Sequence, residues 1–412
     1  MSASQREFDV VLYGATGFVG KQTVAYFAQH ARGLRWALAG RNEAKLCAVQ
    51  AACGAGAAGA GLIVADAQDA AALGALAART RVVLSTAGPF ALFGGPLVAA
   101  CVQQKTHYVD ITGETPWVRG LIDLHHAQAA ASGTRIIPGC GFDSVPSDLG
   151  AWLAADALWQ AFDEPCVSVK ASFSMRGGLN GGTLASALNM MDTGQAKALA
   201  QPFLLNPPGT LPANAAQQTD PIAPHKDADF GAWLGPFVMG PINTRVVRRS
   251  AALLRASGVE AYDKKFAYQE YLRFGKGAAA ALTAASFSFG MQSGQLAMQL
   301  APVRRLARAM VPGPGSGPSE RAMDGGSFRC ALIGRTASGK LARVTLADQG
   351  DPGNRATTRM LCESALTLVH SAGDLPGGAT RGGLLTPASG LGDALAARLR
   401  AAGMQIDVTT EA

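Results

Sequence analysis

Short apolar runs alternate with helical patterns over the first 150 residues. The runs cover residues 8–13, 34–39, 62–65, 81–86, 108–111 and 135–137, and the stretches between them repeat apolar residues at helical spacing. Apolar runs this short, without alternating polar positions, are typical of strands buried on both faces. Strands that alternate with helices are joined by right-handed crossovers. The pattern therefore predicts an α/β fold with a parallel, doubly wound sheet of the Rossmann type.

The pattern changes near residue 150. Apolar and polar residues alternate over 167–175, which predicts an antiparallel strand, and apolar residues recur at helical spacing over 183–199. The pattern over 330–346 predicts a hairpin whose turn lies at 337–340. Proline, glycine and asparagine are frequent over 201–245, which predicts a long irregular segment. Residues 311–318 predict a stiff linker, and two helices over 357–371 and 391–402 close the chain. We expect three parts: a Rossmann domain over 1–150, an α+β domain over 151–355, and C-terminal helices over 356–412 that pack back on the first domain.

A glycine-rich turn follows the first predicted strand directly. It reads Gly14-Ala15-Thr16-Gly17-Phe18-Val19-Gly20 and opens a helix. In dinucleotide-binding folds the first glycine permits the tight turn, the second admits the pyrophosphate, and the third lets the helix pack on the strand. An ordinary glycine turn is the alternative, but the strand before it and the helix after it favour a dinucleotide site. A P-loop is excluded because residue 15 is Ala and residue 22 is Gln.

The end of the second predicted strand indicates which nicotinamide cofactor binds. NAD-binding sites place an acidic residue there, whereas an arginine accommodates the 2′-phosphate of NADP. Here the strand ends in Gly40-Arg41-Asn42, which favours NADP(H). Asp66, after the third strand, could accept from the adenine amino group or cap a helix. The small residues Thr86-Ala87-Gly88-Pro89, after the fourth strand, would let ribose and nicotinamide lie against the backbone.

Composition and charge narrow the class of protein. The chain has 412 residues, of which 48% are hydrophobic and 16% charged, and this excludes a disordered chain. The net charge of +7 suits an anionic ligand, but no basic patch suggests nucleic acid. Seven scattered cysteines never form Cys-x-x-Cys, so we expect neither a disulfide framework nor a metal site. Without a leader pattern at residue 1, we expect a cytoplasmic, reduced protein.

Residues 277–303 carry no charge and lie between Lys276 and Arg304. Their length would suffice for a membrane span, but seven serine, threonine and glutamine residues dilute the stretch. A buried helix of the second domain, lining an acyl groove or a homodimer contact, is the preferred interpretation. The alternative is peripheral contact of 277–308 with the inner face of the plasma membrane, in which Arg304, Arg305 and Arg308 meet anionic lipid.

Several motifs together resemble one family. The glycine turn and the first-half motifs are similar to those of the saccharopine dehydrogenase-like oxidoreductases: Gly40-Arg41-Asn42, Gly88-Pro89-Phe90, residues 107–114 and residues 139–150. The second half resembles the bacterial branch of trans-acting enoyl reductases in the following motifs: Gly181-Gly182-Thr183, Gly315-Ser316-Gly317-Pro318, Asp351-Pro352-Gly353 and Leu385-Thr386-Pro387-Ala388. The resemblance implies an NADP-dependent reductase that acts on the double bond of a polyketide-derived or long-chain acyl substrate, free or carrier-bound, in lipid or glycolipid synthesis.

Reduction of an enoyl thioester needs a proton source and a donor to the enolate oxygen. The catalytic candidates at strand ends and at a helix start are Tyr108, Asp143, Ser144 and Thr183, with Asp110 and Glu114 beside them. Ser144 could instead be an N-cap. The sequence has no Tyr-x-x-x-Lys pair, Gly-x-Ser-x-Gly elbow or His-Glu-x-x-His motif. Two other functions stay open: an imine or carbonyl reductase of amino-acid metabolism, and a non-catalytic NADP-binding scaffold at a membrane.

Overall fold

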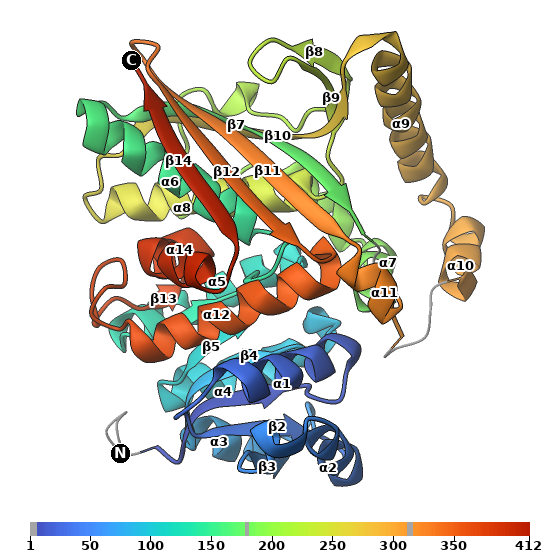
Figure 1. Cartoon of the computed structure of the whole chain (residues 1–412), viewed down its shortest axis with the longest axis vertical. Helices are drawn as coiled ribbons and strands as arrows, with labels where there is room; N and C mark the ends of the chain where they lie inside the picture. The colour runs from blue at the N-terminus through green and yellow to red at the C-terminus, as the bar shows by residue number, and fades with distance from the viewer. Residues whose placement is uncertain (1–5, 178–180, 311–315) are drawn as a thin grey trace.

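The computed structural model describes residues 6–177, 181–310 and 316–412. Two seven-stranded sheets stand one above the other, with the first at the N-terminal end of the molecule (Figure 1). The first sheet has the order β13-β6-β5-β4-β1-β2-β3, and its paired strands are parallel. Its strands are β1 (Phe8–Tyr13), β2 (Trp36–Gly40), β3 (Gly61–Val64), β4 (Thr80–Ser85), β5 (His107–Asp110), β6 (Arg135–Ile137) and β13 (Gly383–Leu384). The predicted parallel Rossmann sheet is confirmed.

Helices cover both faces of the first sheet, as its continuously apolar strands require. The helices of this half are α1 (Phe18–His30), α2 (Glu43–Ala52), α3 (Ala70–Ala78), α4 (Phe90–Gln104) and α5 (Thr115–Ala131), with a 3-10 turn at Gly54–Ala57. Helix α12 (Thr357–His370) returns from the far end of the chain and packs on α1, β4 and β5. It lies between the two sheets (Figure 1).

The second sheet is mixed, with the order β14-β12-β11-β7-β10-β9-β8. Its strands are β7 (Cys166–Arg176), β8 (His225–Asp227), β9 (Ala232–Pro236), β10 (Tyr262–Gly275), β11 (Ser327–Thr336), β12 (Leu341–Gln349) and β14 (Gln405–Glu411). Helix α6 (Val145–Phe162) packs on β7, β11, β12 and β14, and α8 (Gly240–Ala256) packs on β10. One continuous apolar core joins the first sheet, α6, α12 and this sheet, so the two domains are packed firmly together.

The remaining helices complete the second half. They are α7 (Gly181–Asp192), α9 (Gly277–Ala297), α10 (Ala301–Met310), α11 (Glu320–Asp324), α13 (Pro387–Gly390) and α14 (Gly392–Ala401), with 3-10 turns at Gln195–Ala200 and Ala215–Gln217 and a π-turn at Pro352–Ala356. No helix among the described residues combines the length and apolar character needed to cross a bilayer. The predicted linker at 311–318 lies largely outside the described residues.

Three predictions about the second half were wrong in part. The segment 201–245 is not wholly irregular, because it holds β8, β9 and the start of α8. The helix expected over 183–199 ends at Asp192, since Gly194 adopts a positive φ of 71°. The C-terminal segment 356–412 is not only helical: β13 joins the first sheet, and β14 pairs with β12 of the second.

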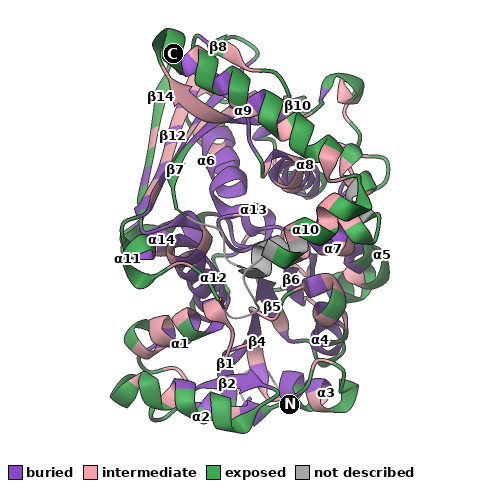
Figure 2. Cartoon of the chain, turned by 90° about the vertical axis from the view of Figure 1, so that its right-hand side faces the viewer, coloured by how far each residue is buried: buried purple, intermediate pink, exposed green. Residues whose placement is uncertain are grey.

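The single buried helix expected over 277–303 was also wrong in part, while the homodimer contact offered with it stays a prediction. Two helices, α9 and α10, replace the single one, and α9 buries only Ala280, Ala284 and Ser288. Figure 2 shows α9 largely exposed along its length. The sequence misled because an uncharged stretch is normally an interior one.

Candidate cofactor and substrate site

The turn between β1 and α1 requires glycine at two positions. Gly14 has a φ of +85°, and a Cβ on it would stand 2.9 Å from Thr86 Oγ1 and from the amide nitrogen of Ala87. A Cβ on Gly20 would stand 2.1 Å from the carbonyl oxygen of Gly14. The turn therefore brings the start of α1 directly against the strand ends, as a dinucleotide site needs.

Among the described residues, no side chain caps the N-terminus of α1. Its N-cap is Gly17, which has no side-chain cap, and no acidic residue stands in the first turn. The first backbone amides of a helix lack partners within the helix, so those of Phe18, Val19 and Gly20 are donors for a pyrophosphate. Ala15 is buried and Thr16 partly buried beneath this cradle. The residues present fit the diphosphate of a dinucleotide.

The residues expected at the adenosine end gather around Tyr13. Burial, and secondarily the charge of Asp66, raises the pKa of Tyr13 to about 12, while the charge of Arg41 opposes this shift. Asp66 accepts from the amide of Gln68 at 2.9 Å, and Asn42 caps α2 by accepting from the amide of Lys45 at 2.9 Å. Both therefore have local structural roles. Within the described residues, the exposed Arg41 side chain makes no hydrogen bond or ion pair, so it is available for a 2′-phosphate.

The segment after β4 is tied to the glycine turn. Thr86 Oγ1 donates to the carbonyl oxygen of Gly14 at 3.1 Å, which sets Ala87, Gly88 and Pro89 beside the turn. Glu114 then closes the start of α4: its carboxylate accepts from the amides of Phe90 at 2.7 Å and Ala91 at 3.0 Å. Ser186 of α7 donates to the same carboxylate at 2.8 Å. Glu114 thus binds the second domain to the Rossmann edge, a role that its position in the sequence did not indicate.

Tyr108 and Asp110 lie inside the protein. Tyr108 is fully buried and donates to Asp110 at 2.9 Å, and Asp110 also accepts from the amides of Thr112 and Gly139. Burial raises the pKa of Asp110 to about 7. These bonds hold the carboxyl ends of β5 and β6 together, which gives Tyr108 a structural role.

The other catalytic candidates differ in their surroundings. Ser144 occupies the N-cap position of α6 without making the cap bond; its buried hydroxyl lies 3.4 Å from Asn243 Oδ1, to which it donates. Asp143 is partly buried, and its side chain makes no hydrogen bond within the described residues. Burial raises the pKa of Asp143 to about 6. Thr183 lies in α7, and its side chain falls outside the described residues.

A hollow opens at the carboxyl ends of three neighbouring strands, where open α/β sheets bind ligands. It lies between the residues that follow β5, β6 and β13 and the first turns of α8, and its free volume is about 20 Å³, which is room for one water-sized group before any side chain moves. Its apolar walls are Val118, Leu205, Ile242, Val246 and Leu385. Thr112, Thr115, Thr386 and Arg249 supply the polar side chains.

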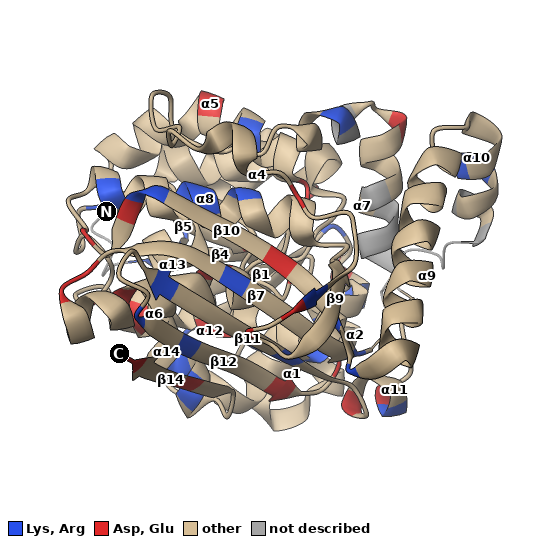
Figure 3. Cartoon of the chain, turned by 90° about the horizontal axis from the view of Figure 1, so that it is seen from above, with Lys and Arg blue, Asp and Glu red and all other residues tan. Residues whose placement is uncertain are grey.

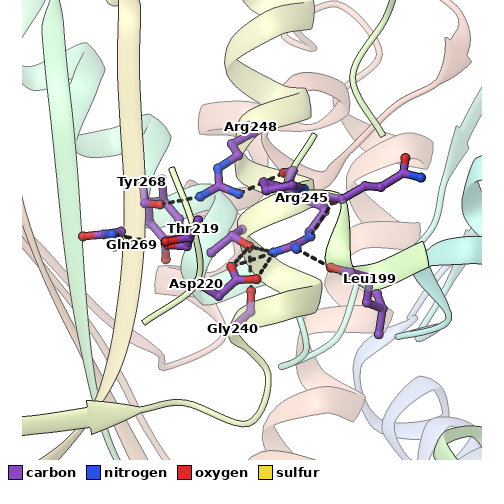
Figure 4. A network of polar contacts seen from close by, with 11 residues as sticks. Leu199, Thr219, Asp220, Gly240, Arg245, Arg248, Tyr268 and Gln269 are labelled. Atoms are coloured by element: carbon purple, nitrogen blue, oxygen red, sulfur yellow. Dashed lines mark hydrogen bonds and ion pairs between the residues drawn. The ribbon is translucent and has the colours of Figure 1, made fainter. Parts of the chain in front are cut away.

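Three buried arginines lie on α8 beside the hollow, and Figure 4 shows two of them, Arg245 and Arg248. Arg245 pairs with Asp220 at 2.5 Å, and Arg248 donates to the carbonyls of Pro202 and Tyr268. Arg249 donates to the carbonyls of Leu205 and Leu384, and no carboxylate pairs with it among the described residues. Burial lowers the pKa of Arg249 to about 9. Sequence reasoning missed this group, although three arginines within five residues of one amphipathic helix were the available signal.

Glu270 is a second feature that the sequence did not reveal. It lies fully buried at the middle of β10 and accepts from Ser147, Tyr268 and Asn243 at 2.7–2.8 Å. Burial raises the pKa of Glu270 to about 7. Within the described chain, no cluster of His, Cys, Asp and Glu side chains could hold a metal ion.

Comparison with known proteins now places the chain. Residues 10–137 match the family model described as the saccharopine dehydrogenase NADP binding domain. This chain is 39% identical to a trans-acting enoyl reductase of Mycobacterium tuberculosis and 38% identical to one of Mycobacterium ulcerans, over 99% of both chains in each case. A second M. tuberculosis protein, provisionally given the same name, is 39% identical over 99% of both chains. The chain belongs to the saccharopine dehydrogenase-like oxidoreductases, in their trans-acting enoyl reductase branch.

A solved structure supports the same family fold. Yeast saccharopine dehydrogenase (L-Glu forming), in its apo form, aligns over 98% of this chain and 100% of its own, with a TM-score of 0.52 and 14% identity. This saccharopine dehydrogenase-like protein is therefore an NADP-dependent oxidoreductase, and the predicted family, enzyme class and cofactor are confirmed. The residues that hold NADP(H) stay predictions, supported by the geometry above.

Proposed function

We propose that the protein uses NADPH to reduce the carbon–carbon double bond of an α,β-unsaturated acyl thioester, in free or carrier-bound form, during lipid or glycolipid synthesis. The observation that carries the proposal is the hollow beyond β5, β6 and β13, whose walls are mainly apolar. An acyl chain needs such walls, whereas an amino-acid substrate needs charged partners for its carboxylates. The names of the full-length relatives support the same reaction.

When bound, NADPH supplies a hydride, which adds to the β-carbon of the acyl group. The electron pair of the double bond moves toward the carbonyl, and a proton must then reach the α-carbon. The glycine turn and the amides of α1 fix the diphosphate, and Arg41 would hold the 2′-phosphate. The apolar walls exclude water, which strengthens the interactions that stabilise the developing negative charge.

Asp143 is the residue we assign as the proton source; it does not itself line the hollow but lies four residues beyond Gly139, which does. It follows β6 at the junction of the two domains, where the neighbouring Phe142 ring contacts Phe173 and Phe328 of the second sheet. Its pKa of about 6 leaves a useful fraction protonated near neutral pH. Tyr108 and Ser144 are fully buried, and their hydroxyl groups instead donate hydrogen bonds to Asp110 and Asn243.

One observation favours the rival reaction, the reduction of an imine formed with an amino acid. Arg249 lines the hollow, is buried, and has no carboxylate partner within the described residues. A substrate carboxylate would complete such a pair. Arg249 is nevertheless the one cation among the residues that line the hollow, and both of its Nη atoms already donate to backbone carbonyls. The rival reaction is therefore less well supported.

The test is a substrate panel followed by nicotinamide absorbance. The purified protein and NADPH are mixed with trans-2-enoyl thioesters of increasing chain length, and separately with a 2-oxo acid plus an amino acid. We expect NADPH oxidation with the enoyl thioesters alone, and faster turnover on longer chains. Oxidation only with the 2-oxo acid and amine would establish the rival reaction, and tight NADPH binding without any turnover would favour a scaffold.

A further inference from the structure

Helices α9 and α10 form an arm at one side of the second domain (Figure 1). The arm covers residues 277–310, and α9 rests on β9 and β10. Its inner face is made of small residues, Ala280, Ala284 and Ser288, and Phe287 packs on Phe274 with ring centroids 5.4 Å apart. The inner face thus already has its partner in the protein.

The outer face of α9 carries large apolar side chains that no described residue covers. Leu282, Phe289 and Leu296 are 70%, 74% and 65% exposed. They stand seven residues apart, so they form one stripe along the helix, and the helical periodicity puts this stripe opposite the buried face. Leu300 and Leu306 continue the exposed apolar side chains into α10, at 60% and 65%. A surface of this kind marks an interaction site.

The charge of the arm has a single sign. No aspartate or glutamate occurs from residue 277 to residue 319. Lys276 is exposed directly before α9, and Arg305 is exposed within α10. Arg304 closes α9 by donating to the carbonyls of Met298 and Gln299 while it pairs with Asp192. From above, the arm shows no acidic residue (Figure 3).

We propose that the outer face of the arm binds the surface of an anionic phospholipid bilayer. An apolar stripe with cations at its ends is the arrangement of an interfacial helix, whose side chains enter the acyl boundary while its cations meet the head groups. Since no described helix is long and apolar enough to cross a bilayer, the contact lies along the membrane surface.

Two other partners fit the arm less well. A second copy of this chain would cover the apolar stripe but would bring no anionic group to Lys276 and Arg305. An acidic protein would set its carboxylates against a stripe that is uncharged from Gly277 to Ala297. An anionic bilayer, with an apolar interior and negatively charged head groups, matches both the apolar stripe and the cations of the arm.

The inner side of α9 closes a small hollow of the second domain. Met291, Gln292 and Gln295 form one wall of this hollow, opposite Phe237, Pro241 and Glu270, and its free volume is about 50 Å³. Because α9 stands between this hollow and the exposed stripe, docking of the arm would leave the hollow on the side away from the bilayer. This proposal does not depend on which double bond the enzyme reduces.

Vesicle sedimentation of the full-length protein tests the proposal. The probes are vesicles of phosphatidylcholine alone and vesicles that also contain phosphatidylglycerol. We expect binding to the anionic vesicles about tenfold or more tighter than to the neutral ones, and weakened by salt. The double variant Leu282→Ser/Phe289→Ser should lose about tenfold or more of this binding. Its side chains are exposed, so folding should be retained, which thermal unfolding and NADPH titration verify.

A matched control separates this stripe from general hydrophobicity. Leu124 and Leu211 are 75% and 63% exposed on other parts of the surface, and Leu124→Ser/Leu211→Ser should bind vesicles as the parent protein does. Failure to bind anionic vesicles, or equal binding by the Leu282/Phe289 variant, overturns the proposal. So does a parent dimer that this variant converts to monomers, because the stripe would then be an interface between copies. Turnover of soluble enoyl thioesters is measured in a separate assay. If the proposed reaction is not observed, the vesicle-binding result still tests the membrane contact.

Discussion

Replacement of Gly20 by alanine tests the geometry of the nucleotide turn. A Cβ at this position would stand 2.1 Å from the carbonyl oxygen of Gly14 and 2.9 Å from the carbonyl carbon of Ala15. Both neighbours are backbone atoms, so neither can rotate away as a flexible side chain would. Ordinary contact begins at 3.4 Å, so α1 and the turn must separate by more than 1 Å.

The displacement should have two measurable effects. Overpacking of a tight contact destabilises a protein by about 1–3 kcal/mol, so the thermal midpoint of the Gly20→Ala protein should fall. The turn also moves away from the diphosphate. At a concentration of about 100 times Kd, NADPH stabilises the folded protein by about 2.7 kcal/mol, and after a roughly hundredfold loss of affinity the same concentration gives only about 0.4 kcal/mol.

Thermal unfolding with and without NADPH measures both effects. The matched control is Gly74→Ala within α3, where a Cβ meets no atom within 4 Å. Alanine is a better helix former than glycine by about 1 kcal/mol, so this control should be unchanged or slightly stabilised and should keep the full NADPH shift. A Gly20→Ala protein that keeps both its midpoint and its NADPH shift would refute the reasoning.

Three further predictions concern the charged groups. Arg41→Ala should weaken NADPH binding by about tenfold to a hundredfold, the value of a charge-assisted hydrogen bond, and leave NADH binding unchanged. Fluorescence titration measures both affinities, with the exposed Arg32→Ala as the control. An Arg41→Ala protein with the NADPH affinity of the parent would contradict the prediction. If Asp143 donates the proton, its acid form is needed, so kcat should fall as pH rises through about 6. Asp143→Asn should lower kcat about a hundredfold or more and flatten the profile; an unchanged profile would exclude the role. The raised pKa of Glu270, about 7 against an ordinary 4.5, means that its contribution to stability is fully present below about pH 4.5 and is lost as pH rises through about 7. This loss amounts to about 3 kcal/mol in the free energy of unfolding. In denaturant titrations between pH 5 and pH 8, the Glu270→Gln protein should therefore lose less stability than the parent protein. Equal losses in the two proteins would show that Glu270 is not the cause.

The sequence by itself determined the first six strands of the first sheet and the glycine turn after β1. Each of these features is local: a strand, a glycine turn and a helix follow one another within residues 8–30, and Arg41 directly follows its strand. Backbone preferences and apolar periodicity act over such distances, so they can be read from neighbouring residues. The parallel order follows from the same alternation, because helical crossovers return each strand in one direction.

Only the tertiary structure decided the roles of the polar residues. Glu114 meets the start of α4 and Ser186 of α7, and Glu270 on β10 meets Ser147 on α6. No local pattern encodes such pairs, because their members lie tens to more than a hundred residues apart. The same holds for β13, whose two residues join β6 after some 250 intervening positions. The exposed face of α9 is the clearest case. Its uncharged sequence is typical of an interior helix, but α9 lies at the edge of the second sheet, where one side of it has no partner among the described residues.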